Sequence, residues 1–155
     1  MNGNSLARLY GINTFAIKSN LEGFTEQDAM YQPAPGGNCA NWILGHIVAT
    51  RSQILEYLGE PPLWTEEEIK PFLRGSDPTA NTQITIPLSR MLSDLEASQE
   101  KLAAVLNRMT PEQFQAPIND QTMYDKLAFL QFHEGYHAGQ LGMLRRLVGK
   151  SGAIQ

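Results

Sequence analysis

Residues 129–141 read Phe-Leu-Gln-Phe-His-Glu-Gly-Tyr-His-Ala-Gly-Gln-Leu, and this stretch has the clearest helical pattern in the chain. Its two histidines, His133 and His137, are four residues apart, so a helix would project both from one face, about 40° apart on the helical wheel. Apolar residues recur around them at steps of three and four, which predicts a helix rather than a strand. The pattern extends over residues 122–148, and Gly149 follows it in the position where a helix usually ends.

The same periodicity occurs in three further segments, residues 5–20, 39–58 and 87–109. Asn38 precedes the second of these, and its short side chain is expected to cap the helix by accepting from the free amides of the first turn. A long connection, residues 59–86, separates the second and third segments and is rich in proline, glycine and acidic residues. Such a length between packed helices suggests a crossover. The predicted fold class is therefore all-α, a four-helix bundle with a long crossover between helices 2 and 3.

Length and composition limit the class of protein. The chain has 155 residues, which predicts a single domain over residues 1–155. A net charge of −4 at pH 7 argues against a general nucleic-acid-binding surface. The one cysteine, Cys39, excludes an intramolecular disulfide and a multi-cysteine metal cluster. No apolar run approaches the roughly 20 residues of a membrane span, and the N-terminal residues do not resemble a signal peptide, so we expect a cytoplasmic protein with no membrane partner.

The chain has three histidines, His46, His133 and His137, and all of them lie in predicted helices on faces that also carry apolar residues. On the last helix this face, which we expect to point to the core, carries Phe129, Leu130, Tyr136, Gln140, Leu141, Leu144 and Leu147. A single histidine on such a face is usually a hydrogen-bonded core residue. Two buried imidazoles one turn apart, however, are costly unless they share a proton or an ion. We therefore favour a metal site that joins the three imidazoles and leaves positions open, as catalytic sites do.

The segment His133-Glu-Gly-Tyr-His137 also matches H-E-x-x-H, the zinc-protease motif. That class of enzyme needs a third ligand further along the chain, but no Asp, Glu or His follows His137. Peptide deformylases combine the motif with an upstream cysteine on a mostly β scaffold, and the Gly-Gly-Asn-Cys39-Ala context does not fit them. The third ligand has to come from upstream, where His46 is the remaining histidine.

Two motifs stand in the second and fourth helices, Asn41-Trp-Ile-Leu-Gly-His46 and His133-Glu-Gly-Tyr-His-Ala-Gly-Gln-Leu141. Leu58-Gly-Glu-Pro-Pro-Leu-Trp64 and Phe72-Leu-Arg-Gly75 lie in the connection. In this order they resemble the DinB/YfiT-like family of metal-dependent enzymes over most of the chain. The resemblance implies a four-helix bundle, often a homodimer, with one divalent ion on three histidines.

Those three histidines match His46, His133 and His137 one for one. Imidazole ligands suit zinc, nickel, iron and copper, so metal availability decides among them. We expect zinc or nickel, with iron or manganese as alternatives. Some relatives transfer low-molecular-weight thiols such as bacillithiol or mycothiol, or use them in isomerisation. The resemblance therefore implies a small-molecule substrate, with a thiol as one candidate, and a metal-dependent thiol S-transferase or hydrolase. The alternative is a non-catalytic metal-binding or stress-response module, in which the ion ties two helices together.

Two further residues are candidates for catalytic roles. Glu134 lies at the edge of the inward face, where it could orient a ligand imidazole or act as a general base, or could be a solvated or salt-bridged residue. Gln140 lies one turn after His137 and could contact a ligand or the substrate. Cys39 is expected to face inward at the start of its helix, but it is about two turns from His46 and is left out of the site.

Overall fold

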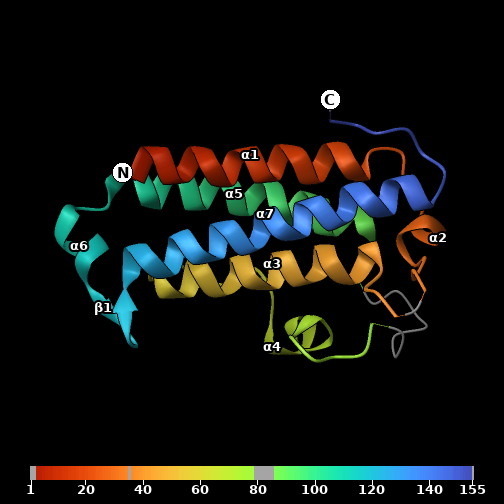
Figure 1. The fold of residues 1–155 in the computed structure, drawn as a ribbon. Helices are drawn as coiled ribbons and strands as arrows, with labels where there is room; N and C mark the ends of the chain where they lie inside the picture. The colour runs from red at the N-terminus through yellow and green to blue at the C-terminus, as the bar shows by residue number, and fades with distance from the viewer. Residues whose placement is uncertain (1–2, 35, 79–85, 155) are drawn as a thin grey trace.

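The computed structural model describes residues 3–34, 36–78 and 86–154, and four long helices make up most of it (Figure 1). They are the four that the sequence predicts: α1 (Gly3–Leu21), α3 (Ala40–Tyr57), α5 (Leu88–Arg108) and α7 (Met123–Leu147). Helices α1 and α7 run in one direction along the bundle, and α3 and α5 run in the opposite direction (Figure 1). The prediction of an all-α fold is confirmed.

Each long helix packs against two others. Helix α1 contacts α5 and α7, and α3 contacts the same two helices, so α1 and α3 lie diagonally across the bundle. Fully buried side chains from three helices fill the centre, among them Leu44, Met91 and Leu141. The helices that carry the histidines, α3 and α7, are therefore neighbours, as a site shared between them requires.

The long connection after α3 is a crossover, as predicted. Because α3 and α5 are parallel, the chain must return along the bundle before α5 can begin (Figure 1). On the way it forms two short helices, α4 (Glu66–Ile69) and the 3₁₀ helix η1 (Lys70–Phe72). Trp64 anchors the connection: its ring is buried, and its indole Nε1 donates to Asp94 Oδ2 of α5 at 2.7 Å.

Helix α3 begins differently from the prediction. Cys39, not Asn38, occupies the N-cap position, and its side chain makes no capping hydrogen bond. The prediction that Asn38 caps this helix is therefore wrong, and the N-cap position falls on the next residue of the chain. Helix α7 shows the usual pattern, because the Thr122 hydroxyl accepts from the amide of Asp125 at 3.1 Å.

Three short helices begin with capping boxes led by threonine: α2 (Glu26–Ala29), α4 and α6 (Pro111–Gln115). The last of these forms a short extra turn directly after α5. A two-residue antiparallel pair, β1 (Pro117–Ile118) with β2 (Gln121–Thr122), then leads into α7. None of the helices in the described ranges combines the length and the apolar character that a bilayer span requires.

Two asparagines of α1 fix the position of α7. The side-chain amide of Asn13 donates to the Gln131 carbonyl at 2.9 Å, and that of Asn20 donates to the Ala138 carbonyl at 3.1 Å. Opposite them α7 carries glycines: a Cβ at Gly135 would lie 3.4 Å from the Asn13 amide, and a Cβ at Gly142 would lie 3.3 Å from the Asn20 amide. The absence of side chains there lets the two helices approach closely.

Candidate metal centre

His46 of α3 and His133 and His137 of α7 meet at one point between the two helices. One ring nitrogen from each lies within 4.8 Å of the other two, which is a spacing that a single metal ion can bridge. The Nε2 atoms of His133 and His137 are 3.1 Å apart. The His46 ring faces the other two rings edge-on, at centroid distances of 5.2 and 5.1 Å. The structure thus brings together all three residues that the sequence predicts as metal ligands.

His46 is held by the crossover and by its own helix. Its Nδ1 donates to the Phe72 carbonyl oxygen at 2.7 Å, so in the neutral ring Nε2 carries the lone pair. Trp42, one turn earlier on α3, stacks on the imidazole with a centroid distance of 4.9 Å and an interplanar angle of 7°. The Phe72 ring lies directly over Gly45, where a Cβ would come within 2.3 Å of it. A glycine at this position therefore lets the carbonyl of Phe72 reach His46.

His137 is held by a neighbour on its own helix. Its Nδ1 donates to Gln140 Oε1 at 2.7 Å, and the amide nitrogen of Gln140 donates to the Tyr136 hydroxyl at 3.2 Å. As with His46, this leaves the lone pair on Nε2, which is the atom that faces His133. Gln140 thus contacts a predicted ligand, and this contact fixes the direction of the imidazole.

The surroundings lower the pKa of all three imidazoles, which favours their neutral form. Burial is the main cause and lowers the pKa of His137 to about 4, against a smaller raising effect of the Gln140 hydrogen bond. Burial also lowers the pKa of His46, and burial is the largest cause that lowers the pKa of His133, with smaller electrostatic effects of His46 and Arg74. Neutral imidazole is the form that binds metal ions.

The three histidine nitrogens are arranged as ligands of one metal ion rather than as three independent side chains. With the Nδ1 atoms of His46 and His137 committed as donors, their Nε2 lone pairs point into the same small space as His133. Three converging nitrogens, two of them on rings held from the opposite side by a hydrogen bond, are an arrangement in which histidines bind a divalent ion. Such ligands suit zinc, nickel, iron and copper.

Glu134, which sequence alone suggested as a base, an orienting group or a salt-bridged residue, is ion-paired deep in the bundle. Its carboxylate accepts from Arg51 Nε at 2.5 Å and from Arg51 Nη2 at 2.7 Å. The two side chains are only 1% and 2% exposed. Both carboxylate oxygens therefore bind the guanidinium of Arg51, and this pair joins α3 to α7, the helices that carry the histidines.

Arg51 was not among the residues that sequence reasoning singled out. Its remaining donors reach the two other helices: Nη1 donates to Gln99 Oε1 at 3.1 Å, and Nη2 donates to Thr14 Oγ1 at 3.1 Å. The Tyr10 ring lies 4.7 Å below the guanidinium. A polar network thus connects all four helices. The signal in the sequence was an isolated arginine in the otherwise uncharged stretch from His46 to Ile54.

The apolar face of α7 was predicted less well than its histidines. Phe129 and Tyr136 were expected to face the core, but they are 57% and 59% exposed, and Leu147 is also exposed. The prediction is wrong for these three residues, because they lie on the part of the α7 surface that no other helix covers. His133 is only half-buried, and the Phe129 ring lies 6.3 Å from it on the solvent side.

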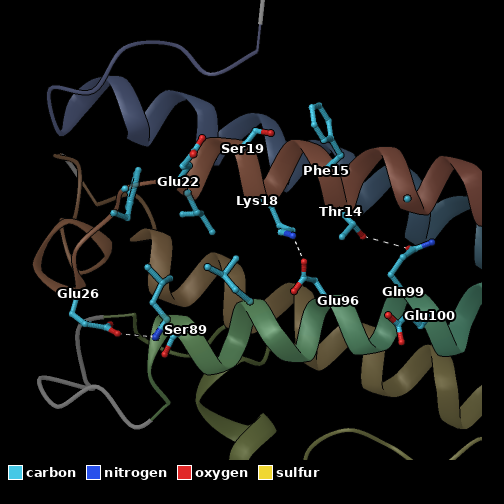
Figure 2. A pocket seen from close by; sticks show the side chains of 16 residues that line it. Thr14, Phe15, Lys18, Ser19, Glu22, Glu26, Ser89, Glu96, Gln99 and Glu100 are labelled. Atoms are coloured by element: carbon cyan, nitrogen blue, oxygen red, sulfur yellow. Dashed lines mark hydrogen bonds and ion pairs between the residues drawn. The ribbon is translucent and has the colours of Figure 1, made fainter.

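A hollow in the described part of the chain lies away from the histidines. It is a groove of about 1030 Å³ between α1 and α5, on the side of the bundle away from α7, and Figure 2 shows it closely. An ion pair between Lys18 and Glu96 crosses it, and the Thr14 hydroxyl lies 3.4 Å from Gln99 Oε1 at its inner wall (Figure 2). No histidine lines this groove, so it is separate from the histidine cluster.

Comparison with known proteins agrees with this architecture. A family model of the DinB superfamily matches residues 17–141, a range that includes His46, His133, His137 and the crossover. A search of curated proteins finds no match. Because the family match covers most of the chain, and the bundle, the crossover and the three histidines agree with it, the chain belongs to the DinB superfamily.

Proposed function

We propose that this protein binds one divalent metal ion, zinc or nickel, through His46, His133 and His137, and uses it to transform a small-molecule substrate. The observation that supports this most directly is the convergence of the three ring nitrogens within 4.8 Å. A bound ion would supply a Lewis acid that lowers the pKa of a thiol or of water. The reaction class that fits this chemistry is thiol transfer or hydrolysis.

The protein's own residues would act by positioning. The Phe72 carbonyl and the Gln140 side-chain oxygen accept hydrogen bonds from the Nδ1–H groups of His46 and His137 and hold both rings in the tautomer that can bind a metal. The ion pair of Glu134 with Arg51 fixes the separation of α3 and α7. We therefore assign Glu134 a positioning role in place of a general base, because Arg51 binds both of its oxygens.

Metal content tests the site. His46→Ala and His133→Ala should each abolish most of the metal that co-purifies with untagged protein, measured by inductively coupled plasma mass spectrometry. Gln53→Ala, an exposed residue on α3, is the control and should retain one ion per chain. If His46→Ala retains metal at the level of this control, the cross-helix site is wrong.

Turnover tests the reaction. A panel of small thiols with electrophilic acceptors, assayed with metal-loaded and metal-free protein, should show rates that depend on the metal. Rates that are the same with and without metal would contradict the proposal. Metal binding with no turnover on any substrate would instead favour the module in which the ion only joins the two helices.

We also expect a homodimer. Helix α7 exposes a series of large apolar side chains to solvent: Phe129, Phe132, Tyr136, Met143 and Leu147. Contiguous exposed apolar surface of this kind is typical of an interaction face, and a second copy of the chain is the partner that the family resemblance suggests. Sedimentation velocity at micromolar concentration should give a dimer, and Phe132→Glu with Met143→Glu should give a monomer.

A further inference from the structure

The part of the crossover that follows η1 is attached to α3 beside His46. The Trp42 indole Nε1 donates to Ser76 Oγ at 2.8 Å, and the Ser76 hydroxyl in turn donates to the Pro71 carbonyl at 2.7 Å. Pro71 directly precedes Phe72, whose carbonyl accepts from His46. One serine hydroxyl thus connects α3 to the stretch of crossover that contacts a predicted metal ligand.

His46 has two supports, and Ser76 binds to both of them. The first is the Phe72 carbonyl, which accepts from Nδ1 of His46 at 2.7 Å. The second is the Trp42 ring, which stacks on the imidazole at a centroid distance of 4.9 Å. A serine hydroxyl can accept and donate at once, so Ser76 binds the indole of one support and the backbone next to the other. Without this hydroxyl, the buried indole of Trp42 would lose its acceptor.

The backbone holds the Ser76 side chain in place. The Ser76 amide donates to the Leu73 carbonyl at 3.0 Å, which closes a turn over residues 73–76. Within this turn Gly75 has φ of 87°, in the left-handed region that glycine adopts without steric cost. The position of the hydroxyl is therefore fixed by the turn as well as by its two side-chain hydrogen bonds.

A second serine holds the beginning of the crossover in a similar way. Ser52 of α3 is fully buried, and its Oγ accepts from the backbone amides of Leu63 at 2.7 Å and Trp64 at 3.1 Å. The Trp64 ring touches the Phe72 ring at a centroid distance of 5.6 Å, but the group that contacts His46 is the Phe72 carbonyl. Ser52 therefore stabilises the crossover without binding either support of the ligand.

We propose that Ser76 is a positioning residue for the metal site, and that metal binding and docking of residues 71–76 on α3 stabilise each other. As an acceptor for Nδ1–H of His46, the Phe72 carbonyl raises the basicity of Nε2 and so favours a metal ion there. Because coupling between two equilibria is reciprocal, metal on Nε2 must favour the docked crossover to the same extent. This inference rests on the proposed function, since it requires the three-histidine metal site.

A double-mutant cycle tests the role of Ser76, with Zn²⁺ affinity measured by competition with a chelator. Ser76→Ala removes the hydroxyl, and Trp42→Phe keeps an aromatic ring at the position that stacks on His46 but removes the indole N–H. Each should weaken zinc affinity about fivefold or more, the lower range for coupling between sites. The double variant should bind zinc about as well as the weaker single variant, because both changes remove the same hydrogen bond.

Ser52→Ala is the matched control. It also removes a serine hydroxyl that attaches the crossover to α3, so it should lower the midpoint of urea denaturation at least as much as Ser76→Ala does. Its effect on zinc affinity should be much smaller than that of Ser76→Ala. This comparison separates a positioning role from a general loss of stability.

Hydrogen exchange tests the reverse direction on wild type, without any substitution. A peptide that covers residues 70–77 should exchange more slowly in zinc-loaded than in metal-free protein. The amides of Leu73 and Ser76 donate to carbonyls within this segment, so they exchange when it opens. The peptide that covers α6, at the end of the bundle where α7 begins, is the control and should show little change (Figure 1).

Each outcome decides a separate point. Unchanged zinc affinity in Ser76→Ala, additive effects of the two single variants, or an equal loss of affinity in Ser52→Ala would overturn the role of Ser76 and leave the metal site standing. Exchange of residues 70–77 that zinc does not slow would overturn the mutual stabilisation. Wild type that binds no zinc would instead contradict the proposed metal site itself.

Discussion

Glu134→Gln is expected to destabilise the fold strongly, because it removes the negative charge that faces a buried guanidinium. In the wild type, the two side chains are 1% and 2% exposed and joined by hydrogen bonds of 2.5 and 2.7 Å. A glutamine can still accept one of these bonds, but it supplies no charge. Arg51 would then remain positively charged in the interior, with only neutral partners such as Thr14 and Gln99.

Removing one partner of a buried ion pair costs about 3–5 kcal/mol. This is a large part of the roughly 5–15 kcal/mol by which a domain is stable. In a chain of this size each kcal/mol lowers the melting temperature by about 2–4 °C, so the variant should melt roughly 6–20 °C below the wild type. The double variant Arg51→Met with Glu134→Gln removes both charges and should recover more than half of the lost free energy.

The assay is urea denaturation of metal-free protein, followed by far-ultraviolet circular dichroism. Glu100→Gln makes the same chemical change at an exposed position of α5 and should leave the midpoint within about 0.5 kcal/mol of wild type. If Glu134→Gln unfolds at the midpoint of this control, the ion pair does not stabilise the bundle. Lost turnover with unchanged stability would return Glu134 to the role of a general base.

Three further predictions concern the histidines and their supports. Gln140→Leu leaves Nδ1 of His137 without its acceptor and should weaken metal affinity about tenfold or more. Competition with a chelator measures this affinity, and an unchanged value would mean that the hydrogen bond does not orient the ring. In metal-free protein, the pKa of His137 is lowered to about 4, so between that pH and the usual pKa of 6.5 the unfolded state binds more protons than the folded state. The free energy of unfolding should therefore decrease as pH falls through this window. Denaturant titrations at several pH values measure this, and a flat profile would contradict it. Gly45→Ala puts a Cβ within 2.3 Å of the Phe72 ring and should lower the free energy of unfolding by about 1–3 kcal/mol. It should also weaken metal binding, because the Phe72 carbonyl holds His46. A variant with the melting temperature and metal content of wild type would show that the ring moves freely.

The sequence predicted the parts of this protein that depend on helical spacing. Helix-forming periodicity located all four long helices, and the four-residue spacing of His133 and His137 indicated their shared direction. The length of the connection after Tyr57 indicated a crossover, because two parallel helices need a return path. In each case, the evidence was local in the chain, and packing did not override it.

The environment of each side chain could not be predicted in the same way. A helical wheel gives the direction of Glu134, but its partner Arg51 lies 83 residues away, and only the packing of α7 against α3 brings them together. Phe72 supports His46 through a backbone carbonyl, which has no signature in the side-chain sequence. Contacts between distant residues, rather than local propensity, define these features.

The paired asparagines of α1 fix the register of α7 along the bundle. Asn13 and Asn20, the carbonyls of Gln131 and Ala138, and the glycines opposite them repeat at the same interval of seven residues, about two helical turns. If α7 slid along α1 by a single turn in either direction, at least one of the two asparagines would face a residue with a side chain where glycine now leaves room. These paired contacts therefore oppose a shift of register between the two helices. The height at which α7 presents its histidines is thus set in part by α1, a neighbouring helix that contributes no ligand.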